Sequence, residues 1–180
     1  MNKNVLIIST SPRRGGNSEM LADAFARGAA EAGNQVEKIS LYDKTIGFCR
    51  GCLTCVKTNR CVMRDDADAI AQKMGKADVL VFATPVYYYE MSGQMKTMLD
   101  RANPLYTSDY AFRDVYLLAA AAEEEESAMD GAIHGLQGWI ACFPKSRLAG
   151  TVFGGGVDRA GAIRGDAALD RAYEMGKTVS

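Results

Sequence analysis

Near the start of the chain an apolar run passes into a polar loop, which reads Val5-Leu6-Ile7-Ile8-Ser9-Thr10-Ser11-Pro12-Arg13-Arg14-Gly15-Gly16-Asn17-Ser18. The apolar run is typical of a strand covered on both faces, and an Ala-rich helical pattern follows the loop. Backbone N–H groups at the start of a helix attract phosphate, and the helix dipole adds to that attraction. Five side chains supply further donors: Ser9, Ser11, Arg13, Asn17 and Ser18. The loop therefore predicts a phosphate site between a strand and a helix.

Two other phosphate-binding motifs are missing from the sequence. It has no G-x-G-x-x-G pattern after a strand, which disfavours a dinucleotide site of the NAD type, and no G-K-[ST] pattern, which disfavours a P-loop NTPase. A loop rich in hydroxyl groups suits the single phosphate of a mononucleotide. The alternative is an ordinary strand-to-helix loop with a polar helix cap.

Five runs rich in apolar or β-branched residues predict strands, and helical patterns lie between them. Strands are expected at 5–9, 36–41, 79–84, 115–120 and 148–153, and helices at 18–32, 67–74, 92–102, 127–142 and 166–177. Regular alternation of strand and helix implies right-handed crossovers and a parallel sheet. The sequence thus predicts a three-layer α/β/α fold: a doubly wound, five-stranded parallel sheet in the flavodoxin-like order 2-1-3-4-5, within a single domain over 1–180.

In this strand order the first and third strands flank the switch point, so a ligand should lie beyond their carboxyl ends. The loops 10–17 and 85–91 are therefore expected to form the site. The second loop reads Thr84-Pro85-Val86-Tyr87-Tyr88-Tyr89 and offers a flat apolar wall with polar tips. The alternative is a tyrosine cluster at a subunit interface, to which the later aromatic residues Tyr106, Tyr110 and Phe112 are expected to contribute.

The loop pattern S-x-S-P-R-x-G-G-N-S resembles the NADPH-dependent FMN reductase family. Further matching blocks are Ala83-Thr84-Pro85-Val86-Tyr87-Tyr88, Ser92-Gly93-Gln94-Met95-Lys96, Leu99-Asp100-Arg101 and Gly154-Gly155-Gly156-Val157, so the resemblance spans nearly the whole chain. It implies a tightly held FMN, a homodimer or tetramer, and transfer of two electrons from NAD(P)H to a quinone, free flavin or similar acceptor. The resemblance places the FMN phosphate at Ser9, Ser11, Arg13, Asn17 and Ser18, and the flavin ring at Pro85, Val86, Tyr87 and Tyr88. No catalytic side chain is expected, because the flavin carries the chemistry.

A cysteine cluster follows the second predicted strand. Its spacing is C-x2-C-x2-C-x5-C, formed by Cys49, Cys52, Cys55 and Cys61. Four thiolates so close in sequence can wrap a [4Fe-4S] cluster or a tetrahedral zinc ion. A third alternative is no metal at all, with the thiols packed beside the flavin as small apolar groups. The fifth cysteine, Cys142, is expected to be a buried structural residue of a helix.

The cysteine spacing resembles the compact motif of the iron-sulfur flavoproteins. That resemblance implies a [4Fe-4S] cluster that passes electrons to FMN. The alternative function is therefore an electron carrier of the iron-sulfur flavoprotein or flavodoxin type, with protein partners in place of a small-molecule substrate.

The composition bears on partners and location. The chain has 21 basic and 22 acidic residues, and this near-neutral balance gives no electrostatic case for nucleic acid or an anionic membrane. No apolar run approaches the length of a membrane helix, and no signal-peptide pattern opens the sequence, so a cytoplasmic protein is expected. Asp100 and Arg101 are expected to pair as a structural ion pair near a helix end.

Overall fold

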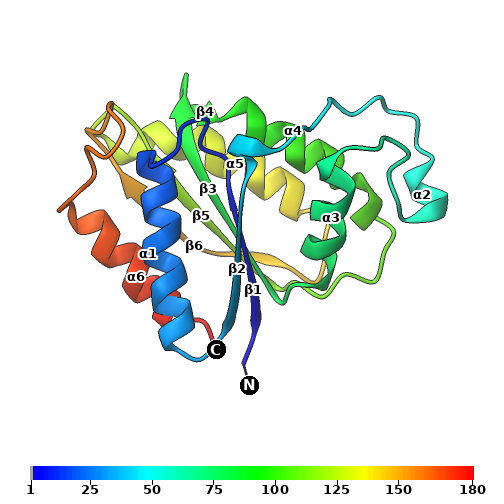
Figure 1. Cartoon of the computed structure of the whole chain (residues 1–180), viewed down its shortest axis with the longest axis horizontal. Helices are drawn as coiled ribbons and strands as arrows, with labels where there is room; N and C mark the ends of the chain where they lie inside the picture. Colours follow the sequence, from blue (N-terminus) through cyan, green and yellow to red (C-terminus); the bar gives the residue numbers. More distant parts are fainter. Residues whose placement is uncertain (1) are drawn as a thin grey trace.

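The computed structural model describes residues 2–180 as a parallel sheet between two layers of helices (Figure 1). Five parallel strands run in the order β2-β1-β3-β5-β6. Their bounds are Asn4–Ser9 (β1), Gln35–Ser40 (β2), Val79–Tyr87 (β3), Asp114–Ala120 (β5) and Arg147–Gly154 (β6). Counted along the chain, this is the predicted order 2-1-3-4-5, and it confirms the flavodoxin-like α/β fold.

The predicted number of strands was wrong by one. A sixth strand, β4 (Glu90–Met91), pairs antiparallel with the end of β3, where Val86 lies opposite Met91 and Tyr87 opposite Glu90. A strand of two residues is too short for a period-2 pattern to appear in the sequence. The hairpin extends β3 beyond the sheet edge, toward the predicted site.

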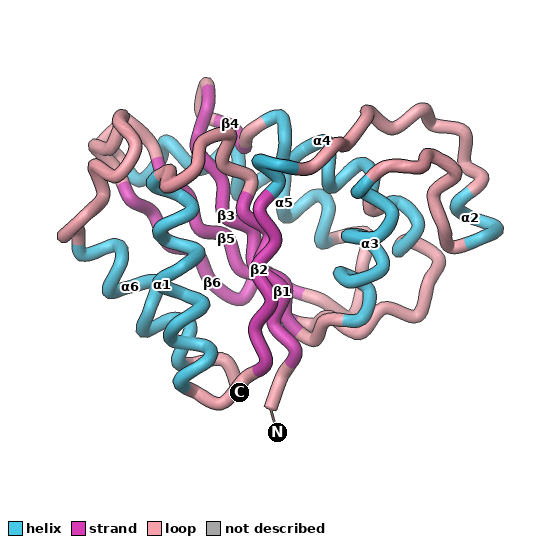
Figure 2. Tube along the Cα trace, in the orientation of Figure 1, coloured by secondary structure: helices cyan, strands magenta, loops and turns pink. Residues whose placement is uncertain are grey.

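Helices cover both faces of the sheet (Figure 2). One layer contains α1 (Asn17–Glu31) and α6 (Ala167–Lys177), and the other contains α3 (Asp66–Lys76), α4 (Gly93–Arg101) and α5 (Asp130–Ile140). Shorter elements are α2 (Cys55–Thr58) and the 3-10 turns η1 (Leu41–Asp43), η2 (Asn103–Leu105) and η3 (Glu126–Met129). The predicted helix 127–142 is thus divided between η3 and α5. Among the described helices, none is long and apolar enough to cross a membrane.

The core explains why the strands are apolar runs. On β1, Leu6 and Ile8 pack in the cluster beneath α3, α4 and α5, while Val5 and Ile7 pack in the cluster beneath α1 and α6. A strand buried on both faces needs apolar side chains at every position, whereas β2 lies at the sheet edge and buries only Ile39.

An aromatic cluster lies between the sheet and α5. Tyr110 and Phe112 are buried there, and the ring of Phe112 lies 5.2 Å from Phe143 and 5.8 Å from Trp139. The prediction that Tyr110 and Phe112 serve a subunit interface was therefore wrong, because these rings fill the protein's own core. Tyr106 is exposed.

Candidate functional site

The loop between β1 and α1 is a tight, well-anchored turn. Both the backbone N–H and the hydroxyl of Thr10 donate to the carbonyl oxygen of Ala83 on β3, at 2.8 and 3.0 Å. Ser11 Oγ and the N–H of Gly16 both donate to the carbonyl oxygen of Arg13, at 2.7 and 3.3 Å. Gly16 has no room for a side chain, because a Cβ there would lie 2.3 Å from Ser11 Oγ. The turn therefore places the start of α1 at the carboxyl edge of the sheet.

Two buried hydroxyl groups at this turn lack a hydrogen-bond partner among residues 2–180. They are Ser9 Oγ, at the end of β1, and Ser18 Oγ, in the first turn of α1. Leaving a buried polar group unpaired costs about 1–3 kcal/mol, so such groups call for an explanation. The first N–H groups of α1 also have no intrahelical acceptor, and the capping residue Gly16 offers no side chain. These unused donors fit a bound phosphate.

The other predicted phosphate ligands have partners within the protein. The side chain of Asn17 bonds three backbone groups of the loop after β6, those of Val157, Arg159 and Ile163, at 2.9–3.3 Å. Arg13 is exposed, and its guanidinium donates to the carbonyl oxygen of Asp158 at 3.3 Å. The side chain of Asn17 therefore links α1 to a neighbouring loop, which leaves the backbone N–H of Asn17 as the group that would bind a phosphate.

Sequence reasoning missed one acidic residue that contacts this loop. Glu19 Oε2 accepts a hydrogen bond of 2.8 Å from the N–H of Gly15, whose φ is +63°. Its other oxygen lies 3.5 Å from Lys38 Nζ, which also pairs with Asp23. Glu19 is the third residue of α1, the position from which acidic side chains commonly reach back to the helix start, and this spacing was the available signal.

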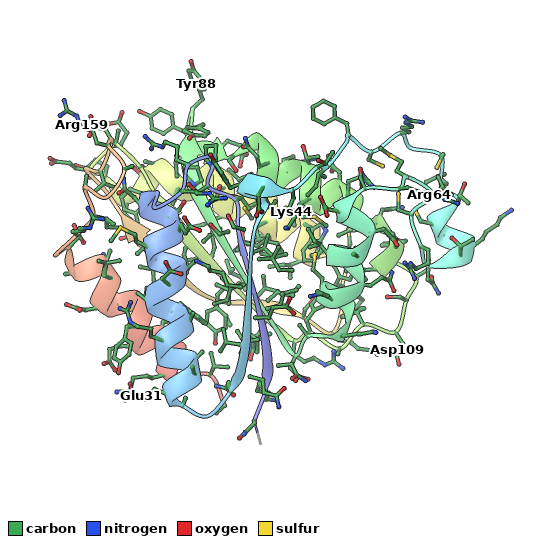
Figure 3. All side chains as sticks on the ribbon, viewed as in Figure 1. Glu31, Lys44, Arg64, Tyr88, Asp109 and Arg159 are labelled. Carbon is green, nitrogen blue, oxygen red and sulfur yellow. The ribbon has the colours of Figure 1, made fainter. Side chains whose placement is uncertain are left out.

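A cleft of about 170 Å³ opens beside the loop, at the carboxyl ends of the strands. Its walls include seven predicted site residues: Ser11, Arg13, Asn17, Ser18, Pro85, Val86 and Tyr87. The remaining walls come from Pro12 in the same loop, from residues 120–122 at the end of β5 and from residues 157–158 after β6, none of which was a predicted site residue. Of the two other predicted residues, Ser9 is buried at the end of β1, and Tyr88 points away from the sheet edge into solvent (Figure 3).

Tyr88 and Tyr89 form the two-residue turn between β3 and β4. Their φ angles are +51° and +63°, as a type I′ turn requires at both central positions. Asn-Gly usually fills such a turn, because a non-glycine residue held in the left-handed region costs on the order of 1–3 kcal/mol. The tyrosine pair therefore carries backbone strain beside the cleft, with the Tyr88 ring fully exposed.

A second cavity, of about 410 Å³, is lined by all five cysteines. Its other walls are mostly apolar and come from the cysteine segment itself, the end of α4, the η2 region and the aromatic cluster. Cys142 was predicted to be buried, but it is exposed, because α5 ends at Ile140 and Cys142 lies in the turn that follows. The four clustered cysteines share this cavity, yet among residues 2–180 no three potential ligands already stand at metal-binding distances.

Hydrogen-bond donors face three of the cysteine sulfurs. Asn103 Nδ2 lies 3.0 Å from Cys55 Sγ, Arg101 Nη2 lies 3.3 Å from Cys61 Sγ, and the N–H of Gly51 lies 3.5 Å from Cys49 Sγ. Hydrogen bonds from the backbone and hydroxyl of Thr54 lower the pKa of the fourth thiol, Cys52. A set of thiols with N–H donors and apolar walls fits a thiolate-bound metal centre.

The predicted pairing of Asp100 with Arg101 was wrong. Arg101 is buried and bonds both carboxylate oxygens of Asp65, at 2.6 and 2.8 Å, whereas Asp100 pairs with Lys96 on the exposed face of α4. Consecutive helical residues do not face each other, so neighbours in sequence rarely pair. The Arg101 guanidinium holds the pKa of Asp65 below its usual value, and Asp65 raises the pKa of Arg101.

The two sites occupy different parts of the molecule. Of the described residues, none lines both the cleft and the cysteine cavity. Figure 1 shows α2, within the cysteine segment, at the opposite end of the molecule from α1 and α6.

Comparison with known proteins identifies the family of this chain. Residues 3–153 match the model of the NADPH-dependent FMN reductase family. An iron-sulfur flavoprotein of Methanocaldococcus jannaschii is 41% identical over 101 residues, covering 56% of this chain and 52% of that protein. One from Archaeoglobus fulgidus is 39% identical over 94 residues, covering 52% of this chain and 43% of that protein. The matched part thus spans about half the length of these curated relatives.

Among solved structures, an NAD(P)H:quinone oxidoreductase from Methanothermobacter marburgensis superposes over the full length of both chains, with a TM-score of 0.72 and 18% identity. This likeness shows a shared fold. Because the family match covers most of the sequence, including the loop between β1 and α1 and the β3–β4 hairpin, the chain belongs to the NADPH-dependent FMN reductase family.

Proposed function

We propose that this chain is an FMN-dependent oxidoreductase of the iron-sulfur flavoprotein type, with FMN in the cleft and a [4Fe-4S] cluster in the cysteine cavity. The observation that carries the proposal is that Cys49, Cys52, Cys55 and Cys61 all line one cavity. The names of the two archaeal relatives support it.

The residues of the cleft bind and orient the flavin. The hydroxyls of Ser9 and Ser18 and the first N–H groups of α1 would hold the phosphate, with Ser11 and Arg13 at the rim. Pro85, Val86 and Tyr87 would form one wall for the ring. Bound FMN supplies the electron-transfer chemistry, so the protein's part is positioning, without an acid or base side chain.

The cleft does not enclose a whole flavin nucleotide. Its 170 Å³ falls below the roughly 300–1,000 Å³ of typical ligand pockets, so much of the ring would lie open toward the exposed Tyr87, Tyr88 and Tyr89. The open face leaves room for NAD(P)H or an electron acceptor. A second copy of the chain would supply the missing wall, and we therefore propose that the protein is a homodimer or tetramer. We also propose that it works in the cytoplasm.

In the cysteine cavity, the four clustered thiolates would bind the iron, and the apolar walls would exclude water. A bound cluster supplies one-electron transfer. Cys142 is assigned no ligand role, because the other four cysteines complete the set. The loop carrying Cys49 and Cys52 is exposed, so those two thiols are free to close on a cluster.

A second candidate is an NAD(P)H-dependent reductase of quinones, free flavin or similar acceptors that holds no metal. The spread of the cysteine thiols favours it, since as they stand no three potential ligands within residues 2–180 meet at one point. The fold shared with a quinone oxidoreductase is consistent with this candidate.

An anaerobic reductive titration separates the two candidates. Wild-type protein should take up about three electrons per chain, two by FMN and one by the cluster. Cys55→Ser should take up about two, and the matched control Cys142→Ser about three. Uptake of two electrons by all three proteins would exclude the cluster and favour the metal-free reductase.

A further inference from the structure

Two side chains outside the cysteine motif reach its sulfurs. Asn103 begins η2 and donates to Cys55 Sγ, and Arg101 ends α4 and donates to Cys61 Sγ. Both residues line the cysteine cavity. The donors thus belong to the helical layer beside the sheet and not to the exposed cysteine loop.

Arg101 is locked in place. Its side chain is fully buried, and besides Asp65 it donates to the carbonyl oxygen of Gly47 at 2.8 Å. Asp65 in turn accepts from the N–H groups of Gly47 and Ala67, at 3.0 and 3.1 Å, and caps α3. Because Asp65 and Gly47 hold the guanidinium, its Nη2 group stays directed at Cys61 Sγ, at 3.3 Å.

Hydrogen bonds to sulfur favour the more negative state of a metal–thiolate centre. Reduction adds one electron, so N–H donors stabilise the reduced form and raise the reduction potential. Asn103 supplies a neutral donor to one ligand, and Arg101 supplies a charged donor to another.

We propose that Asn103 and Arg101 are positioning residues that hold Cys55 and Cys61 and raise the reduction potential of the four-cysteine centre. This inference rests on the proposed function, and it assigns tuning roles to residues outside the ligand motif. Arg101 sets the centre's charge environment, with Asp65 as its anchor, and Asn103 adds an independent contribution.

The test measures the midpoint potentials of the cluster and of FMN, under anaerobic conditions, in the complete chain. Asn103→Ala should lower the cluster potential, shifting the ratio of reduced to oxidised cluster about threefold to tenfold, or ~28–59 mV for one electron. Asn103→Asp should lower it further, because a carboxylate replaces the donor. Arg101→Lys should also lower the cluster potential, because a single ammonium group cannot bond both Asp65 and Cys61 as the planar guanidinium does.

Thr107→Val is the matched control. The Thr107 hydroxyl lies 3.2 Å from the carbonyl oxygen of Val56 and 3.1 Å from Asn59 Oδ1, so it ties the segment after η2 to the α2 region through groups other than sulfur. Its loss should leave the cluster potential unchanged, and the FMN potential should stay constant in every variant.

Equal cluster potentials in Asn103→Ala, Thr107→Val and wild type would overturn the inference while leaving the proposed function intact. If Arg101→Lys fails to fold, the two Asn103 variants decide. Wild-type protein that binds no iron or sulfide after anaerobic reconstitution would overturn the proposed function, and this inference with it.

Discussion

Within residues 2–180 the buried hydroxyl groups of Ser9 and Ser18 have no hydrogen-bond partner, although the rest of the loop is closely hydrogen-bonded. A polar group kept in that state has a cost in the free protein, which a bound phosphate would remove. At the scale of single residues, the proposed phosphate site is therefore marked by two unpaired hydroxyl groups more than by the hydrogen bonds around them.

Ser18→Ala should affect stability and binding in opposite directions. FMN binding should weaken roughly tenfold to a hundredfold, because a hydrogen bond to a charged group contributes about 1.5–3 kcal/mol. The flavin-free protein should be as stable as wild type or slightly more stable, since the variant removes a hydroxyl that has no partner within the described part of the chain. Flavin fluorescence titration and urea unfolding measure the two effects. Riboflavin, which lacks the phosphate, is the control ligand, and an equal loss of its affinity would place the hydroxyl elsewhere.

Glu19 places a carboxylate on the N–H of Gly15, beside the predicted phosphate. Glu19→Gln keeps the hydrogen-bond acceptor and removes the charge, so FMN should bind roughly threefold to tenfold more tightly, as repulsion near a surface allows. Asp23→Asn is the control, because Asp23 shares Lys38 with Glu19 but lies one turn further along α1. If Glu19→Gln and Asp23→Asn bound FMN with equal affinity, Glu19 would have no effect of its own on the phosphate.

At the scale of elements, the β3–β4 hairpin and the end of α4 shape the two sites. The hairpin sets two tyrosines in the left-handed region, and α4 ends in a buried arginine. Both features have a cost in stability that ordinary turn and helix-end residues would avoid.

Replacing Tyr88-Tyr89 by Asn-Gly should stabilise the flavin-free protein by about 1–2 kcal/mol, because Asn-Gly fits a type I′ turn and the Tyr88 ring is fully exposed. Chemical denaturation measures the gain. The same variant should weaken FMN binding or slow turnover if the rings serve the flavin. Unchanged stability would show that the turn relaxes readily, and unchanged binding would remove Tyr88 from the site.

The Asp65–Arg101 pair predicts a pH dependence of stability. Since the pKa of Asp65 is lowered on folding, its contribution is fully present above the unfolded value of about 3.9 and is lost as pH falls through the folded pKa. Asp65→Asn should cost about 3–5 kcal/mol at pH 7, because it leaves Arg101 buried without a counter-charge. The difference between variant and wild type should shrink below about pH 4.

Urea unfolding of the flavin-free proteins between pH 3 and 7 measures this dependence. Asp100→Asn is the control and should cost less than about 1 kcal/mol, because the Lys96–Asp100 pair is exposed. A difference between Asp65→Asn and wild type that stays constant down to pH 3 would contradict the assigned pairing.

At the scale of the whole molecule, the parallel sheet could be predicted because β1, β3 and β5 are buried on both faces and therefore read as apolar runs. The candidate phosphate loop could be proposed for a similar reason, since its hydroxyls and glycines follow one another in sequence. The hairpin was not visible, because Tyr-Tyr carries none of the usual turn signals.

Contacts between segments far apart in the chain also could not be predicted from the sequence. Arg101 meets an aspartate 36 positions away, and Asn103 meets a cysteine 48 positions away. Asn17 looked like a phosphate ligand because of its place in the loop, yet its side chain bonds backbone groups 140–146 positions away. Such pairs follow from how the layers pack, which no local pattern encodes.

The most direct test of the central claim is an absorption spectrum of protein purified without oxygen, combined with assays of FMN, iron and acid-labile sulfide per chain. A chain that holds both groups should show flavin bands on a broad brown absorbance, with about one FMN and about four each of iron and sulfide. Flavin bands alone, without iron or sulfide in the purified or reconstituted protein, would contradict the claim and leave the cysteine cavity without a cluster.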